Sequence, residues 1–450
     1  MLKVLLTAVF LALALAPPSS LAAEMPIYKL LYSAPDPSSQ GAAPETVFEI
    51  APGLFCFLSG MQGQTFGPSL FSLTGAGSAK LIYSFQPETL SYALVQAADG
   101  RLYGAISDPL RQGQYYSVST VGQGFQQYSM GEWSSMWMLA PVPGKLYDGV
   151  ATSADAYGFA RIDETGKVTI IHKLSATEGV PISSMKLVVA ADGDLYGIAG
   201  QGGGLTPPIS VFRLTPSGRY SQLFTFPSPF GTTYGGSLMA ASDGSLYGTF
   251  SGGGVNDTGF IYQATLSGKW HTVASFPAKG TDEGMLDPNS LVEASDGALY
   301  GSTVHNAIFR YDLATHALTL AYQMNPRNLQ GSCAPCNLIQ AMDGKLYGTA
   351  AIGGPGGGAV FSLDFGLPKP RPSVARLVPS SGTAGQQILL WGSHLLGATS
   401  VTFNGVPAAA FQVNSTEAVM ATVPAGAATG PVTVVTANGS VTTKQNFTIQ

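Results

Sequence analysis

The chain repeats one phrase at near-regular spacing, and this repeat constrains the fold more than any other feature of its 450 residues. Each copy joins an Asp-Gly dipeptide to a Leu-Tyr-Gly triplet, as in Ser290–Gly301, SLVEASDGALYG. The aromatic residues of seven copies, some of them degenerate, are Phe55, Tyr103, Tyr147, Tyr196, Tyr247, Tyr300 and Tyr347, spaced 44 to 53 residues apart. A period of this length is typical of solenoids and propellers.

Each copy predicts four short antiparallel strands. A mostly apolar run, Ser237–Ser242 in the fifth copy, leads into Asp243-Gly244, a dipeptide that favours tight hairpins because its residues tolerate positive φ. The Leu-Tyr strand follows, then a glycine-rich loop, a third strand such as Gly259–Ala264, and a fourth strand after Gly268. Four antiparallel strands in about 45–50 residues indicate a β-propeller blade.

The two ends of the repeat region predict ring closure. The seventh copy stops at its third strand, Ala359–Gly366, whereas Ile27–Ser33 reads as a fourth strand that precedes the first copy. Pairing these two segments would complete the last blade and cover an exposed strand edge. We therefore predict an all-β fold in which residues 24–366 form a seven-bladed β-propeller closed by the N-terminal strand.

The repeated phrase resembles the bacterial extracellular repeat family called GloVer, whose units read roughly D-G-x-L-Y-G, then glycine-rich, then G-x-V-F-x-L. The resemblance covers about Tyr28–Phe365 and is strongest in the last four copies. The resemblance implies that the protein is exported and is either secreted or held at the cell surface. It does not imply an enzymatic reaction.

Residues 367–373 predict a proline-rich linker, because alternating prolines stiffen the chain and exclude helix. Residues 374–450 lack the repeated phrase and alternate apolar and polar residues over several strands. This segment resembles an IPT/TIG domain, through Pro379–Gly382, Val401–Gly405 and Asn446-Phe447. The resemblance implies an immunoglobulin-like β-sandwich that acts mostly as a spacer or a protein-contact module.

Residues 1–23 have the pattern of a secretory signal peptide: Lys3, the apolar run Val4–Ala16, and small residues before the expected cleavage site. The apolar run is shorter than the roughly 20 residues that cross a bilayer, and no second long apolar segment follows it. We expect a mature chain without a membrane span that is secreted, periplasmic or bound to the cell surface. The net charge of −5 gives no basic surface for nucleic acid.

No motif in the sequence carries an identifiable reaction. The five histidines are dispersed and share no metal-ligand spacing, and the glycine runs precede strands rather than phosphate-binding helices. We therefore expect no metal and no cofactor. Cys333 and Cys336, in the segment CAPC, are expected to form a structural disulfide; a redox-active pair and a bridge to Cys56 are the alternatives.

One position of the repeat varies in an ordered way. The residue three before the turn is Glu49, Gln96, Glu293 or Gln340 in copies one, two, six and seven, and alanine or valine in the others. These four copies are consecutive around a closed ring, and the first strand of a blade lines the central channel. Our hypothesis is a ligand site at the channel mouth; the alternative is that the four side chains satisfy backbone groups or bond neighbouring blades.

These observations favour a non-catalytic binding or adhesion protein that presents its propeller to a glycan or an extracellular protein. One alternative is a glycosidase or lyase acting on polysaccharide, for which Glu49 and Glu293 are the nearest approach to a carboxylate pair. A purely structural envelope component is the other alternative, because a fold alone does not define a function.

Overall fold

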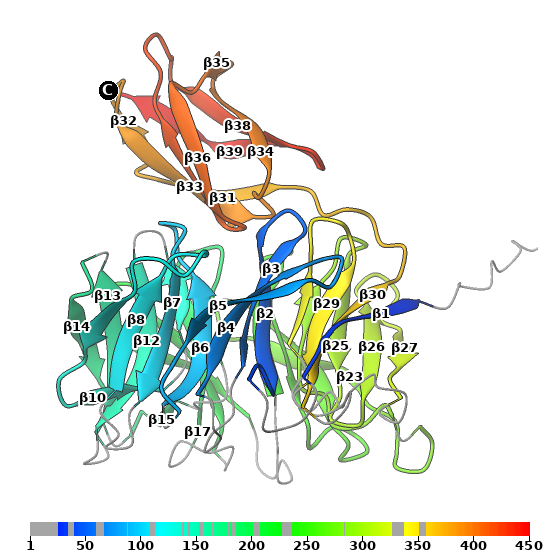
Figure 1. Ribbon diagram of the computed structural model, residues 1–450. Coiled ribbons are helices and arrows are strands. Elements are labelled where there is room, and N and C mark those ends of the chain that lie inside the picture. Colours follow the sequence, from blue (N-terminus) through cyan, green and yellow to red (C-terminus); the bar gives the residue numbers. More distant parts are fainter. Residues whose placement is uncertain are drawn as a thin grey trace, which may run out of the picture.

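The computed structural model describes residues 26–34, 40–59, 67–87, 89–107, 113–136, 139–142, 145–152, 156–163, 165–175, 177–178, 180–181, 186–200, 208–226, 236–282, 284–325, 337–350 and 357–450. Within these ranges every regular element is a β-strand, so the predicted all-β class is confirmed (Figure 1). The predicted signal peptide, residues 1–23, lies outside the described ranges, and so do Cys333 and Cys336.

Before residue 365, the described strands form seven antiparallel sheets, which we number in chain order. Sheet 1 contains β2 (Pro44–Ala51), β3 (Leu54–Ser59), β4 (Ser69–Thr74) and β5 (Ala79–Ser84). Sheet 2 contains β6 (Leu90–Gln96), β7 (Leu102–Ser107), β8 (Gly113–Val118) and β9 (Gln126–Ser129). Sheet 3 contains β10 (Trp133–Ser135), β11 (Ala140–Val142), β12 (Lys145–Thr152), β13 (Tyr157–Asp163) and β14 (Val168–Lys173).

The remaining four sheets follow the same order. Sheet 4 contains β15 (Val180–Pro181), β16 (Val188–Val189), β17 (Leu195–Gly200), β18 (Ser210–Leu214) and β19 (Tyr220–Thr225). Sheet 5 contains β20 (Gly236–Ala240), β21 (Leu246–Phe250), β22 (Phe260–Ala264) and β23 (Trp270–Ser275). Sheet 6 contains β24 (Val292–Glu293), β25 (Ala298–Ser302), β26 (Ala307–Asp312) and β27 (Leu318–Gln323). Sheet 7 contains β28 (Leu338–Gln340), β29 (Leu346–Ala350), β30 (Ala359–Asp364) and β1 (Ile27–Ser33).

The pairing of β1 with β30 is the one that the sequence predicts. The two strands are antiparallel, with Ile27 opposite Asp364 and Leu30 opposite Phe361. The first strands of several neighbouring sheets also contact one another: β2 touches β6 and β28, and β11 touches β6 and β16. The first strands of these neighbouring sheets therefore lie side by side, in a propeller-like arrangement.

The hydrophobic core is divided into clusters that lie between neighbouring sheets. Between sheets 4 and 5, for example, Tyr196 and Val211 pack with Leu246 and Tyr262. Sheets 7 and 1 share a cluster of the same kind, in which the rings of Tyr347 and Phe55 stack with their centroids 4.1 Å apart. Clusters of the same kind join sheets 1 and 2, 2 and 3, 3 and 4, 5 and 6, and 6 and 7.

The repeated Asp-Gly-x-Leu-Tyr-Gly phrase has a direct structural cause. In five copies one carboxylate oxygen of the aspartate accepts the backbone N–H two residues later, at 2.8–3.1 Å. The other oxygen accepts the tyrosine O–H four residues later, at 2.7–3.2 Å. The aspartate thus ties the turn to the strand that follows it, which explains why the two residues recur together.

The final glycine of the phrase makes room for an aromatic ring on the third strand. In sheet 5, Gly248 lies opposite Tyr262, and a Cβ on the glycine would be 2.3 Å from the ring. The same close approach recurs in sheets 2, 4, 6 and 7. Sheets 1 and 3 depart from the pattern. In sheet 1 Cys56 replaces the glycine and faces Ser72, and in sheet 3 Asp148 replaces it and faces Ala160.

After residue 372, the chain forms a two-sheet sandwich. One sheet contains β31 (Ser373–Val378), β33 (Gln387–Ser393), β37 (Ala418–Thr422) and β36 (Ala410–Ser415). The other contains β32 (Ser381–Gly382), β39 (Gly439–Ile449), β38 (Gly430–Thr436), β34 (Ala398–Phe403) and β35 (Val406–Pro407). Side chains from both sheets, among them Leu390, Val419, Val432 and Phe447, form one buried core. We call this sandwich the C-terminal domain.

Candidate functional site at the junction with the C-terminal domain

The four polar residues singled out from the sequence all lie near the Asp-Gly turns, at the end of the sheets that we call the turn face. Glu49 is 5% exposed, and its carboxylate oxygens accept the backbone N–H groups of Gly53 and Met342, each at 2.8 Å. Burial raises the pKa of Glu49, while the two backbone hydrogen bonds oppose that rise. Glu49 therefore bonds sheet 1 to the turn of sheet 7.

Glu293 and Gln340 make the same kind of connection. The carboxylate of Glu293 accepts the backbone N–H of Ser242 at 2.8 Å and its hydroxyl at 2.5 Å. The side-chain oxygen of Gln340 accepts the backbone N–H of Ser295 at 2.8 Å. In all three cases the partner residue immediately precedes the aspartate of the neighbouring turn. These are the contacts that the alternative interpretation expects, because the side chains bond neighbouring sheets.

Gln96 differs, because its partner belongs to the C-terminal domain. The Gln96 side-chain N–H donates to the carbonyl oxygens of Gly100, at 3.2 Å, and Asn414, at 3.1 Å. Asn414 in turn donates its side-chain N–H to the carbonyl oxygen of Ala98, at 2.6 Å. The turn of sheet 2 and one hairpin of the C-terminal domain therefore exchange hydrogen bonds in both directions.

Further contacts join the same part of the turn face to the rest of the C-terminal segment. Asn438 donates its side-chain N–H to the carbonyl oxygen of Met342 at 2.8 Å. The carbonyl oxygen of Pro368, in the linker, accepts from the hydroxyl of Ser295 and from the side-chain N–H of Gln340. We call Gln96, Ala98, Ser295, Gln340 and Met342 the docking arc.

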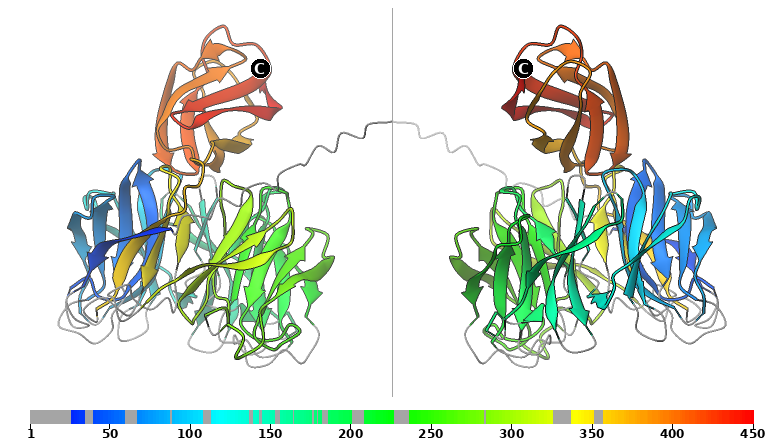
Figure 2. Two further views of the ribbon diagram at one scale, coloured as in Figure 1. Left: turned by 90° about the vertical axis from the view of Figure 1, so that its right-hand side faces the viewer. Right: turned by 90° about the vertical axis from the view of Figure 1, so that its left-hand side faces the viewer.

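A contact with sheet 4 extends this junction beyond the docking arc. The Arg376 side chain packs against the turn of sheet 4 so closely that a Cβ on Gly193 would lie 1.6 Å from its guanidinium nitrogen. The guanidinium also lies over the Trp391 ring, 5.9 Å from the centroid. Figures 1 and 2 show the C-terminal domain standing on this end of the sheets. The domain thus covers part of the turn face.

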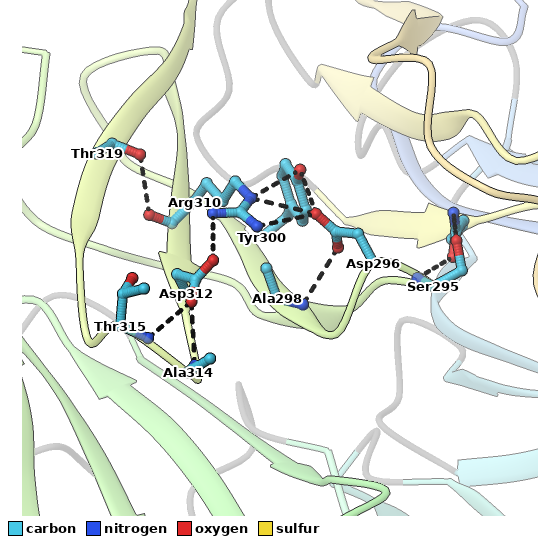
Figure 3. A network of polar contacts seen from close by, with 10 residues as sticks. Ser295, Asp296, Ala298, Tyr300, Arg310, Asp312, Ala314, Thr315 and Thr319 are labelled. Carbon is cyan, nitrogen blue, oxygen red and sulfur yellow. Dashed lines mark hydrogen bonds and ion pairs between the residues drawn. The ribbon is translucent and has the colours of Figure 1, made fainter. Parts of the chain in front are cut away.

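A polar network on sheet 6 shows how the turns themselves are held (Figure 3). Arg310 bridges two carboxylates, that of Asp296 at 3.1 Å and that of Asp312 at 2.9 Å. Asp312 also accepts backbone N–H groups from Ala314 and Thr315, and these bonds together with Arg310 lower its pKa to about 2. The network ties one end of β26 to the turns on either side of it, which is a structural role.

Within the described ranges, no group of three or more His, Cys, Asp or Glu side chains is placed so that it could hold a metal ion. His172 pairs with Glu178 at 3.1 Å, and His305 pairs with Asp287 at 3.0 Å. Cys56 is a buried free thiol whose pKa is raised by burial. The expected disulfide between Cys333 and Cys336 stays a prediction, because both residues lie outside the described ranges. No helix of the described part is long and apolar enough to cross a membrane.

Sequence reasoning identified Gln96 and Gln340 but missed the residues of the C-terminal domain that bond the docking arc. Asn414 and Asn438 are followed by Ser-Thr and Gly-Ser, an ordinary turn composition that gives no sign of a contact about 300 or 100 residues away. Arg376 is likewise an isolated cation in the sequence. Their role depends on how the two parts of the chain are placed in space.

The fold and the junction define a class: an all-β protein whose propeller-like sheets carry a β-sandwich on one end. Comparison with known families refines this statement. Residues 140–307 match the Gloeobacter/Verrucomicrobia repeat, and residues 372–449 match the IPT/TIG domain. The chain therefore carries Gloeobacter/Verrucomicrobia repeats followed by an IPT/TIG domain, and both predicted resemblances are confirmed.

Solved structures resemble this chain in fold, at low sequence identity. A streptogramin B lyase is 15% identical, with a TM-score of 0.53, over 76% of this chain and 99% of the other. The extracellular domain of a putative hybrid two-component system from B. thetaiotaomicron is 13% identical, with a TM-score of 0.51, over 94% of this chain and 57% of the other. No curated protein matches the sequence. At these identities the likeness concerns the fold alone.

Proposed function

We propose that the protein is an exported, non-catalytic binding or adhesion protein that offers a propeller surface to a glycan or an extracellular protein. In this proposal residues 1–23 direct export, residues 24–366 form a closed ring of seven blades, residues 367–373 link the two modules, and residues 374–450 form the IPT/TIG sandwich. Ring closure is supported by the pairing of β1 with β30 and by the cluster that sheets 7 and 1 share.

The observation that carries the proposal is the docking of the sandwich on the turn face. The side-chain N–H groups of Gln96 and Gln340 donate to the carbonyl oxygens of Asn414 and Pro368, which belong to the same chain. The two modules are thereby held as one unit, which suits a protein that must present a surface at a defined distance from its attachment point. With part of the turn face covered, we place the partner surface on the uncovered rim and on the opposite end of the ring.

The alternative is an enzyme acting on polysaccharide, and it makes a distinct prediction for Glu49 and Glu293. Each of these carboxylates already accepts two hydrogen bonds from the chain. General acid catalysis needs a protonated carboxyl that can reach the leaving group, so engagement in internal bonds argues against this role.

A glycan array combined with hydrolysis assays on plant and bacterial polysaccharides tests the proposal. The mature full-length chain should retain glycans or extracellular proteins and release no reducing ends. Release of reducing ends by the wild type that is lost in Glu49→Gln or Glu293→Gln would overturn the proposal in favour of an enzyme. Absence of both binding and turnover would instead leave a structural envelope component.

A further inference from the structure

One residue in the turn of sheet 7 takes part in two different junctions. The N–H of Met342 donates to the Glu49 carboxylate of sheet 1 at 2.8 Å, and its carbonyl oxygen accepts from the Asn438 side chain at 2.8 Å. Met342 is only 8% exposed, so a backbone group that loses its partner there is costly. The residue therefore holds both the C-terminal domain and the interface between sheets 7 and 1, which we call the seam.

Gln340 makes a similar double connection on the other side of sheet 7. Its side-chain oxygen accepts the backbone N–H of Ser295 at 2.8 Å, which joins sheet 7 to sheet 6. Its side-chain N–H groups donate to the Ser295 hydroxyl at 2.8 Å and to the carbonyl oxygen of Pro368 at 3.4 Å. The Ser295 hydroxyl donates to the same Pro368 oxygen. The bond between sheets 6 and 7 thus includes the linker.

The C-terminal domain also reaches across the seam onto sheets 1 and 2. Gly397, in the loop after β33, lies against the turn of sheet 1, and a Cβ on this glycine would be 3.3 Å from the Pro52 ring. Asn414 exchanges hydrogen bonds with the turn of sheet 2. The domain and its linker therefore contact the turns of sheets 6, 7, 1 and 2, and the seam lies in the middle of this row.

The interface between sheets 5 and 6 has the same kind of bond without the domain. Glu293 accepts the backbone N–H of Ser242 at 2.8 Å, as Glu49 accepts that of Met342. Within the part of the chain that the structure describes, the turn that contains Ser242 makes no hydrogen bond with any residue after 366. This interface is an internal standard for the seam.

We propose that the C-terminal domain is a latch on the ring, so that its docking and the closure of the seam stabilise each other. The coupling runs through Met342 and Gln340, because hydrogen bonds that share a residue in one network are not independent. If docking favours closure by a given factor, closure favours docking by the same factor. A partner that draws the domain off the turn face would then loosen sheets 7 and 1. The proposal rests on the closed ring of the proposed function and not on the identity of the partner.

Amide hydrogen exchange and proteolysis of the full mature chain measure the two directions of this coupling. Asn438→Ala removes the donor to Met342 and should speed exchange of the amides in β1, β2 and β30 by up to about fivefold, the factor that one neutral hydrogen bond supplies. Glu49→Gln loosens the seam and should speed cleavage in the linker 367–373 by a similar factor, since cleavage follows the population of the open form.

Two matched controls separate the latch from general loosening. Asn446→Ala alters an exposed asparagine of the same domain and should leave exchange at the seam unchanged. Glu293→Gln weakens the equivalent bond between sheets 5 and 6 and should leave cleavage of the linker unchanged.

The latch is refuted if Asn438→Ala speeds linker cleavage but not exchange at the seam, or if Glu49→Gln speeds exchange at the seam alone. If either variant fails to fold, the wild type provides the test in urea below its unfolding transition. Exchange in β1 and β30 and cleavage of the linker should then rise together with urea, and separate dependences would overturn the proposal. Unprotected β1 amides in the wild type without urea would instead refute ring closure, and with it this part of the proposed function.

Discussion

Replacing Gly248 with alanine tests why the repeat ends in glycine. The new Cβ would lie 2.3 Å from the Tyr262 ring and 2.4 Å from the backbone oxygen of Ser237. Tyr262 is fully buried, and Ser237 is held in the ladder between β20 and β21, so neither atom can move away freely. Overpacking of this kind costs about 1–3 kcal/mol, and more where backbone must shift.

One smaller effect of opposite sign reduces this cost. Replacing glycine by alanine restricts the unfolded chain and returns about 0.4–1 kcal/mol. We therefore expect Gly248→Ala to lower the free energy of unfolding by about 2 kcal/mol. Gly244→Ala is the control: its φ is +85° and a Cβ there meets nothing within 4 Å, so only backbone strain of about 1–2 kcal/mol applies, and after the same gain from the unfolded chain its net cost should be about 1 kcal/mol or less.

Urea unfolding followed by tryptophan fluorescence measures the difference. Trp270 packs against the cluster that contains Tyr262, so its emission reports on this region. In a Tyr262→Ala background only the clash with the Ser237 backbone oxygen remains, so Gly248→Ala should cost less there than it does in the wild-type background. The reasoning is refuted if Gly248→Ala is no less stable than Gly244→Ala, or if the two substitutions at 248 and 262 are additive.

Further predictions concern pH, the docking arc, ring closure and the cysteines. Burial raises the pKa of Glu45 to about 8, so the folded state holds this proton more tightly than the unfolded state does. The free energy of unfolding should therefore fall as pH rises from about 4.5 toward 8. In urea unfolding, Glu45→Gln should be about 2–4 kcal/mol more stable than the wild type at pH 8 and no more stable at pH 4. Asn414→Ala combined with Asn438→Ala removes the donors to Ala98 and Met342, and we expect faster proteolysis in the linker 367–373 and a larger radius of gyration, whereas Asn446→Ala, an exposed position, should change neither. Deletion of residues 24–33 should destabilise sheet 7 and promote aggregation through the bared edge of β30; a deleted protein that stays monomeric with unchanged unfolding would contradict the closure argument. Alkylation of the denatured, unreduced protein should label only Cys56, and labelling of three thiols would exclude the disulfide between Cys333 and Cys336.

The sequence predicted the repeating part of the structure because that part is governed by local rules. The Asp-Gly turns, the strands around Leu-Tyr-Gly and the pairing of Ile27–Ser33 with the last copy all depend on short-range patterns or on one unmatched edge. The sequence also predicted that the four polar residues lie next to the turns, because each of them stands three residues before the turn of its own copy. Their partners were not, because Met342, Ser242 and Ser295 belong to neighbouring copies about 45 to 300 residues away.

By itself, the sequence determined an all-β chain of repeated four-stranded units followed by an IPT/TIG segment, because hydrophobic alternation and turn chemistry are written within each unit. Only the tertiary structure decided that Asn414, Asn438 and Arg376 meet the turn face, and that Glu49 bonds a turn that also holds the C-terminal domain while Glu293 bonds the turn of Ser242. The reason is that identical local residues acquire different partners according to the packing between sheets and domains, which no local pattern encodes.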